Sequence, residues 1–477
     1  MIEILLVATA LLPQVDTVQE APVVISLEKA LEIALSESPT VKVADKEIER
    51  TGYARKGTYA SLFPSIDGSA SYQRTIKKQV MYMDFDMGDI MGGGDAGSSK
   101  LPGGGDKPSS SSGGGIEVGR LNTWSAGITA AMPLVNAQLW KSLKISDQDV
   151  ELAVEKARSS RLETVNQVKQ AYFACLLARD AFEVYKSAYE NALANLEQIQ
   201  RKYNAQKASE LDLTRAKTTL ANAIPSVYDA ESSMLISLWQ LKAVMGLNLE
   251  ANIDIEGELE DYAEHMLYDI TEGESYSLEN NSSLKQLSIQ AEQLADAIKL
   301  QKYANLPSLA LTFSYNINAM TNDFNFSEYK WSPYSFAGLS LSIPIFAGGK
   351  RAAAIKQARV QADELAIQRE STERQLKIAI RQYLNSMENS MKSYSAAQSA
   401  VETARKAYSI ASKSYDVGRS TLTDLNDAQY ALTQAELTVS SAIFNFLSAK
   451  ADLEGMLGAD FIDEQGNVKL NKTYNNE

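Results

Sequence analysis

The feature that most constrains this chain is one order of motifs that occurs twice. Three segments of the first half are matched in order by three of the second: 59–65 by 303–308, 126–134 by 337–345, and 203–213 by 415–425. The pairs Met245-Gly246 and Leu457-Gly458 then close the two halves. Because the order is kept, a duplicated unit explains the matches better than chance likeness among helices. We therefore expect two like halves.

Each half is predicted to contain a helix, a β-hairpin and a long helical hairpin, in that order. The expected first repeat is 23–249, with its β-hairpin at 63–135 and its helical hairpin at 137–248. The expected second repeat is 277–458, with its β-hairpin at 307–347 and its helical hairpin at 349–458. Between them lies a predicted acidic, solvated linker at 250–276, and a polar tail follows at 459–477.

The start of the chain, 1–22, is interpreted as a signal peptide. Residues 4–12 resemble the apolar core of a secretory signal, although Glu3 stands where a basic residue is expected. An ordinary buried segment is the alternative. Ser26 is a suitable N-cap for a first helix from Leu27 to about Leu62, with a counterpart from about Leu278 to Leu306.

Two segments, 137–203 and 349–415, contain no proline and no other helix break. Each would form a helix on the order of 100 Å long, at about 1.5 Å per residue. That length is too great for one globular core. Apolar residues such as Leu376, Ile380, Tyr383 and Met387 recur at alternating spacings of three and four, which predicts coiled packing of these helices into a bundle or cylinder.

Strict alternation marks the strands, most clearly in the second half. Apolar side chains at every second position of 309–317 and 337–345 alternate with mostly small or polar ones. One apolar and one polar face suit a barrel with lipid outside and water inside. No stretch approaches the roughly 20 apolar residues of a transmembrane helix, so any membrane span should consist of strands. The loop at 88–119 is rich in glycine and serine and is predicted to be flexible.

Composition excludes several classes of function. A net charge of −14 argues against binding to nucleic acid. Cys175 and His265 are the single cysteine and histidine, so we expect no disulfide, metal site or lipidated N-terminal cysteine. The sequence also lacks a phosphate-binding glycine loop, a nucleophile elbow and an HExxH motif. Acid/base hydrolysis by carboxylates of the linker is the enzyme alternative, and without such motifs we do not expect an enzyme or a cofactor.

Three motifs together resemble the TolC-like outer-membrane efflux proteins, the outer membrane factor family. The sequence SLEKAL at 26–31, followed by Ser38-Pro39, is similar to that family's opening helix. The sequence LSIPIFAGG at 341–349 is similar to its junction between strand and long helix. The sequence YDVGRST at 415–421, followed by Asp424-Leu425, is similar to its helical-hairpin tip.

The resemblance implies a passive exit duct of a tripartite efflux or type I secretion system. Three protomers would each give four strands to a 12-stranded β-barrel in outer-membrane lipid and their helices to a periplasmic tunnel. The implied partners are a periplasmic adaptor and an inner-membrane pump of the RND, ABC or MFS type. Four strands cannot close a barrel alone, so the physical argument also calls for other copies. A soluble periplasmic coiled-coil scaffold or adaptor is the alternative.

The resemblance also assigns roles at the hairpin tips. Asp424 and Asp427, three apart on one helix face, would form the gate's cation-attracting selectivity ring. We prefer this to the alternative, carboxylates that complement the helix dipole, because we expect both to lie one to two turns into the helix. Tyr415, Asp212 and Arg419 are the predicted gate linkage, although Arg419 stands one place earlier than the family's arginine and Gln206 replaces the glycine of the other half. The predicted adaptor-facing tip residues are Gln206, Lys207, Ser209, Gly418, Ser420 and Thr421.

Overall fold

The computed structural model describes residues 22–81, 116–263, 266 and 276–458. The predicted signal segment up to residue 21, most of the glycine-rich loop, much of 264–275 and the tail at 459–477 fall outside these ranges. The chain divides into two compact units. We call residues 56–144 and 296–356 the strand unit, and the rest the helical unit.

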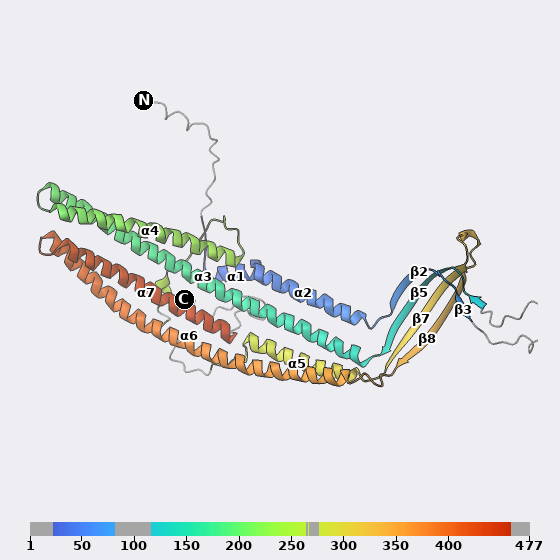
Figure 1. Cartoon of the computed structure of the whole chain (residues 1–477). Helices are drawn as coiled ribbons and strands as arrows, with labels where there is room; N and C mark the ends of the chain where they lie inside the picture. The colour runs from blue at the N-terminus through green and yellow to red at the C-terminus, as the bar shows by residue number, and fades with distance from the viewer. Residues whose placement is uncertain (1–21, 82–115, 264–265, 267–275, 459–477) are drawn as a thin grey trace, which may run out of the picture. The chain divides into compact units, whose positions relative to one another are not determined.

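Two long helical hairpins dominate the helical unit. Helix α3 (Ala137–Asn204) is followed by α4 (Glu210–Met245), and α6 (Lys350–Asp416) by α7 (Leu422–Leu457). With 68 residues, α3 is about 100 Å long at 1.5 Å per residue. In Figure 1, α4 returns along α3 and α7 returns along α6. The Asn166 side chain on α3 donates to Asp452 of α7 at 2.8 Å, so the two hairpins also contact each other.

The main core lies where these helices meet a short parallel strand pair. Strand β1 (Val23–Ile25) pairs with β6 (Ile253–Ile255), beside helix α1 (Leu27–Glu37). Tyr172 of α3 is almost fully buried, and its hydroxyl donates to the carbonyl of Glu256 at 2.6 Å. Burial raises the pKa of Tyr172. Phe173 beside it is fully buried, which stabilises the fold by about 2–3 kcal/mol.

The expectation of a solvated linker at 250–276 is therefore wrong for its first part. Ile253, Ile255 and Leu259 are buried in the main core, and Leu259 begins the short 3-10 helix η1 (Leu259–Tyr262). Arg179 of α3 donates to the Ile255 carbonyl at 3.0 Å. The sequence did not reveal strand β6, because it is only three residues long and an acidic residue lies between its apolar positions.

The first predicted helix is in fact two helices. Ser26 caps α1 as expected, accepting from the Lys29 N–H at 3.4 Å. The chain then breaks at Ser38, with φ −55° and ψ 129°, before α2 (Pro39–Ala60). The residue before a proline is driven out of the helical region by the proline ring, and this explains the break. In the second half, α5 (Ser282–Tyr303) is a single helix.

The strand unit contains an antiparallel sheet in the order β2-β5-β7-β8. Its strands are β2 (Ser65–Arg74), β5 (Asn122–Val135), β7 (Ser308–Thr321) and β8 (Ser332–Ser342). A short ladder joins β3 (Gln79–Met81) to β4 (Ile116–Val118), and the 3-10 helix η3 (Phe326–Glu328) lies between β7 and β8. Strand β8 ends three residues earlier than the alternation to Ile345 predicted, since Pro344 has no N–H for a ladder.

The register of the sheet separates an apolar from a polar face. Ile66 pairs with Ala130, Ala130 with Phe313, and Leu311 with Leu339, so these apolar side chains share one face. On the other face the Thr129 and Ser314 hydroxyls lie 3.1 Å apart. Leu339 is 67% exposed. Among the described residues, the apolar face is therefore left largely uncovered.

No helix within the described ranges combines the length and the apolar run that crossing a lipid bilayer requires.

Candidate functional site

The two helical hairpins turn with the same backbone geometry at their tips. Gln206 after α3 has φ +58°, and Gly418 after α6 has φ +73°. In each turn the next N–H reaches back into the helix: Lys207 N donates to the Lys202 carbonyl at 2.7 Å and Arg419 N to the Ser414 carbonyl at 2.8 Å. Such a left-handed residue satisfies carbonyls that the helix end would otherwise leave unpaired.

Both returning helices begin with a reciprocal capping box. Thr421 N donates to the Asp424 carboxylate at 2.8 Å, and Asp424 N donates to the Thr421 hydroxyl at 3.2 Å. Ser209 and Asp212 repeat this pair at the start of α4. The Thr421 hydroxyl and N–H both donate to the Asp424 carboxylate, and these hydrogen bonds lower its pKa. Each box satisfies helix N–H groups that lack partners within the helix.

This geometry corrects the expected position of Asp424. Helix α7 starts at Leu422, so Asp424 is its third residue and lies in the first turn, rather than one to two turns inside. The reason for preferring a ring to a helix-end role is therefore wrong for Asp424. Asp427 lies three residues further on, and both side chains are exposed. The ring itself stays a prediction.

The contact between the tips centres on Lys202, which the sequence did not single out. Its ammonium lies 3.5 Å from the Asp416 carboxylate, 3.4 Å from the Tyr415 carbonyl oxygen and 4.5 Å from the Tyr415 ring centroid. The Gln198 amide also donates to Asp416. Lys202 directly precedes Tyr203, which matches Tyr415 in the duplication. Its position beside a matched tyrosine is the sequence signal that could have identified Lys202.

The predicted gate residues Tyr415, Asp212 and Arg419 all lie at the tips, and their role as a gate linkage stays a prediction. Tyr415 is half-buried, and burial together with the negative charges of Asp212 and Asp416 raises its pKa. The Asp212 carboxylate accepts hydrogen bonds from the N–H and the hydroxyl of Ser209 in the capping box of α4. Arg419 contributes its backbone N–H to the turn. The structure also brings Tyr415 to Lys202 of the first hairpin, a contact between the hairpins that the sequence did not predict.

The predicted adaptor-facing residues all lie at the turns. Five of the six are exposed: Gln206, Lys207, Ser209, Gly418 and Thr421. Ser420 is half-buried, and its hydroxyl donates to the Ala411 carbonyl at 3.2 Å. Two apolar residues that the sequence did not single out, Leu211 and Val417, are also exposed there, at 57% and 69%.

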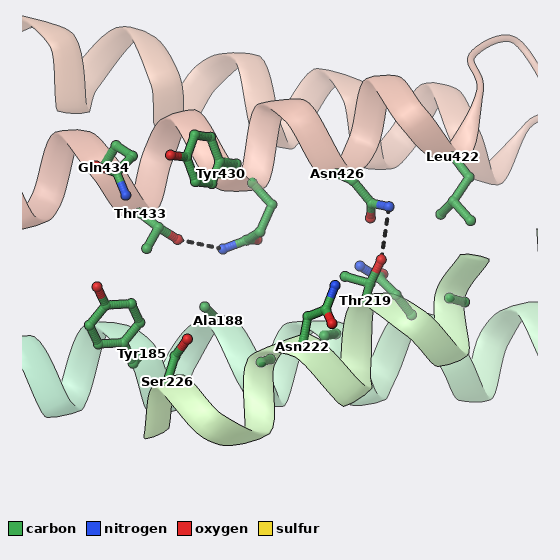
Figure 2. A pocket seen from close by; sticks show the side chains of 15 residues that line it. Tyr185, Ala188, Thr219, Asn222, Ser226, Leu422, Asn426, Tyr430, Thr433 and Gln434 are labelled. Carbon is green, nitrogen blue, oxygen red and sulfur yellow. Dashed lines mark hydrogen bonds between the residues drawn. The ribbon is translucent and has the colours of Figure 1, made fainter. Parts of the chain in front are cut away.

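Behind the tips, the two hairpins pack against each other through a small apolar core, with a cavity beside it. The core consists of Ile199, Leu213, Ala216, Leu422 and Leu425. The cavity, of about 410 Å³, lies among α3, α4 and α7, and no residue that lines it is charged. Figure 2 shows Asn426 of α7 reaching Thr219 of α4, whose hydroxyl accepts at 3.1 Å. Within the described ranges, no three His, Cys, Asp or Glu residues group as a metal would require.

Comparisons with known proteins agree over most of the chain. The family model described as outer membrane efflux protein matches residues 30–247 and 275–459. Outer membrane protein TolC of Vibrio cholerae is 24% identical over 359 residues, which are 73% of this chain and 80% of that protein. Alkaline protease secretion protein AprF of Pseudomonas aeruginosa is 23% identical over 334 residues, 69% of each chain. The Campylobacter jejuni CmeC outer membrane channel superposes with a TM-score of 0.68 at 19% identity, over 94% of this chain and 87% of that one.

Proposed function

The chain belongs to the outer membrane efflux protein family, and from that premise we propose that three copies form one exit duct across the outer membrane. Proteins of this family are outer-membrane channels and not enzymes, with their helices in the periplasm. The alternative of a soluble periplasmic scaffold is set aside for that reason. What the duct assembles with, and how it closes, belongs to the proposal.

The four-stranded sheet carries the proposal of a trimer. Among the described strands, β2 pairs only with β5 and β8 only with β7, so the sheet has two open edges. An unpaired backbone group in lipid costs several kcal/mol, on the order of the penalty for burying an amide without a partner. Three chains would close a 12-stranded barrel and pair every edge. The exposed apolar face would then meet lipid, and the polar face would meet water.

The tips are the proposed contact for a periplasmic adaptor. The turns expose Gln206 and Gly418, which adopt left-handed conformations, together with Thr421. Leu211 and Val417 add apolar area that an adaptor would cover. An inner-membrane pump of the RND, ABC or MFS type would supply the energy, since the duct itself needs no cofactor.

The gate would combine a charged ring with a contact that holds the hairpins together. Asp424 and Asp427 of three chains would attract cations at the tunnel end, in the way that carboxylate rings select cations in channels. Lys202 would hold the second hairpin against the first through Asp416 and the Tyr415 ring. Opening would then require this contact to break while both capping boxes stay intact.

The first test is the mass of the full-length chain extracted from the outer membrane in mild detergent. We expect a trimer. A monomer that keeps its strands would overturn the barrel, because its edges would have remained unpaired in lipid.

The second test concerns the ring. We expect D424N/D427N to reduce cation preference several-fold in single-channel recordings, while the trimer remains intact. The matched control is D229N/E231Q, which removes two exposed carboxylates from α4, and it should keep the wild-type preference. Equal selectivity in both variants would remove the two aspartates from the ring.

A further inference from the structure

A belt of basic residues surrounds one end of the sheet, although the whole chain is acidic. The segments 56–64, 136–144, 296–307 and 343–356 each join a helix directly to a strand. Together they hold eight basic residues and one acidic residue, whereas the chain has 46 basic and 60 acidic residues. Helices α3 and α5 supply Lys141, Lys144, Lys299 and Lys302; helices α2 and α6 supply Lys56, Lys350, Arg351 and Lys356. We call these four segments the basic collar.

The strand register places all four segments at the same end of the sheet. Ser65, the first residue of β2, pairs with Ala131 near the end of β5. Ser308, the first residue of β7, pairs with Ser342, the last residue of β8. In Figure 1 the ends of α2, α3, α5 and α6 accordingly meet the strands there. The collar's segments therefore lie at one end of the sheet, although its residues are spread over 301 positions from Lys56 to Lys356.

One buried carboxylate organises part of this charge without neutralising it. Asp296 of α5 is only 4% exposed, and its carboxylate lies 2.7 Å from Lys141, 3.3 Å from Lys144 and 3.2 Å from Lys299. These hydrogen bonds outweigh burial, which alone would raise the pKa, and lower the pKa of Asp296 to about 2. Three ammonium groups share a single negative charge. Lys144 and Lys299 remain 60% and 54% exposed, so they can also face another anion.

Large apolar side chains lie among the lysines of the collar. Trp140 is 53% exposed, Phe63 69%, and Phe346 86%. Aromatic rings combined with lysines on long apolar stems are characteristic of the interface between a membrane's hydrocarbon and water. Lys144 lies seven residues after the start of α3 at Ala137, and Lys299 lies four residues before the end of α5 at Tyr303. These spacings are about 11 Å and about 6 Å of helix at 1.5 Å per residue. The headgroup layer extends roughly 5–7 Å beyond the hydrocarbon, and a lysine stem spans most of the difference.

We propose that the basic collar binds the anionic headgroups of phospholipids in the periplasmic leaflet of the outer membrane. Charge complementarity selects these lipids over zwitterionic ones, and the exposed rings anchor the same segments in the adjacent hydrocarbon. The inference rests on the outer-membrane location of the family. It does not depend on the adaptor, the pump or the aspartate ring.

The test measures lipid binding to the full-length protein in mild detergent. Fluorescent phosphatidylglycerol and phosphatidylcholine are titrated onto wild type and onto K144Q/K299Q/K302Q, which leaves Asp296 and its partner Lys141 in place. We expect wild type to prefer phosphatidylglycerol and the variant to lose at least about tenfold in affinity for it, since each lysine near an anionic surface contributes substantially to binding. The control K186Q/K217Q/K406Q removes three exposed lysines from the helical unit and should bind as wild type does.

Two further arms use wild type alone, so they do not depend on the folding of a variant. The preference for phosphatidylglycerol should shrink as salt rises from about 0.05 to about 0.5 M, because screening weakens exposed charge pairs. Soluble glycerophosphoglycerol at the same concentration should displace little lipid, because it lacks the chains that the aromatic residues hold. A salt-independent preference, unchanged affinity in the collar variant, or full displacement by the soluble headgroup would each overturn the proposal.

Discussion

The two helical hairpins keep glycine at one end and not at the other. Where α4 and α7 end, Gly246 and Gly458 both adopt left-handed φ, at +77° and +67°. At the tips the left-handed residue is Gln206 in one hairpin and Gly418 in the other. A Cβ at Gly246 would lie 2.6 Å from the Glu37 carbonyl oxygen, whereas nothing lies within 4 Å of one at Gly418. Both hairpins therefore have glycine at the position where another backbone segment lies close, and they differ at the tip, where the space around Gly418 is open.

At the tips the two hairpins have similar backbones but differently charged side chains. The capping acids Asp212 and Asp424 match, but the next position of the proposed ring is Arg215 in the first hairpin and Asp427 in the second. The contact between tips is also one-sided, because Lys202 comes from the first hairpin and Asp416 from the second. A trimer would contain six hairpins with similar backbones. Their charges would repeat only three times, because the two hairpins of each chain differ in charge.

The largest loss of stability should come from adding a side chain at Gly246, where the Glu37 backbone lies close. We expect Gly246→Ala to cost about 3 kcal/mol, since a strained left-handed alanine adds to an overpacked contact. Gly418→Ala, with the same φ sign and open space, should cost about 1 kcal/mol. Denaturant titration of the detergent-purified protein, followed by helix signal, measures both. Equal losses would show that conformation alone, and not the Glu37 carbonyl, keeps Gly246.

Exchanging the left-handed residues of the two tips should change stability in opposite directions. Gln206→Gly removes the strain of a non-glycine residue in a left-handed conformation, which should stabilise the fold by up to about 1 kcal/mol. The greater entropy of glycine in the unfolded chain offsets part of this gain. Gly418→Gln should destabilise by about 1 kcal/mol. The same titration reports both changes. If both variants lose stability, then the Gln206 side chain contributes contacts that the backbone comparison misses.

Sequence patterns predicted what depends on local repetition. The alternation at 309–317 and the uninterrupted helices at 137–203 and 349–415 required only periodicity, and the structure has strand β7 and helices α3 and α6 there. The buried Ile253 and Ile255 were missed because their three-residue strand is stabilised by a partner strand more than 200 residues away. Lys202 was missed because its role depends on how two hairpins meet, and no spacing within either hairpin encodes that meeting.

The contact between tips should be measurable as a coupling. We expect K202M and D416N each to weaken the closed state, with a coupling of about 0.5–1 kcal/mol in a double-mutant cycle, because Lys202 is half-buried and Asp416 is exposed. The open probability of single channels supplies the four free energies. The control pair R405M and E436Q breaks the contact at 3.0 Å between α6 and α7 of one hairpin, and should leave opening unchanged. Additive effects of K202M and D416N would mean that Lys202 acts through the Tyr415 ring instead.

The smallest effect should be a pH dependence of one capping box. Hydrogen bonds from Thr421 lower the pKa of Asp424 below its usual 3.8 in the folded state, so this carboxylate stabilises the fold above pH 3.8. That contribution should be lost as the pH falls through the folded pKa. D424N should therefore lower the melting temperature at neutral pH, and its difference from wild type should shrink below about pH 4. In a T421V background, where the donating hydroxyl is gone, D424N should change the melting temperature less. A difference that persists at low pH would show that Asp424 acts through packing rather than charge, and would separate its structural role from its proposed place in the ring.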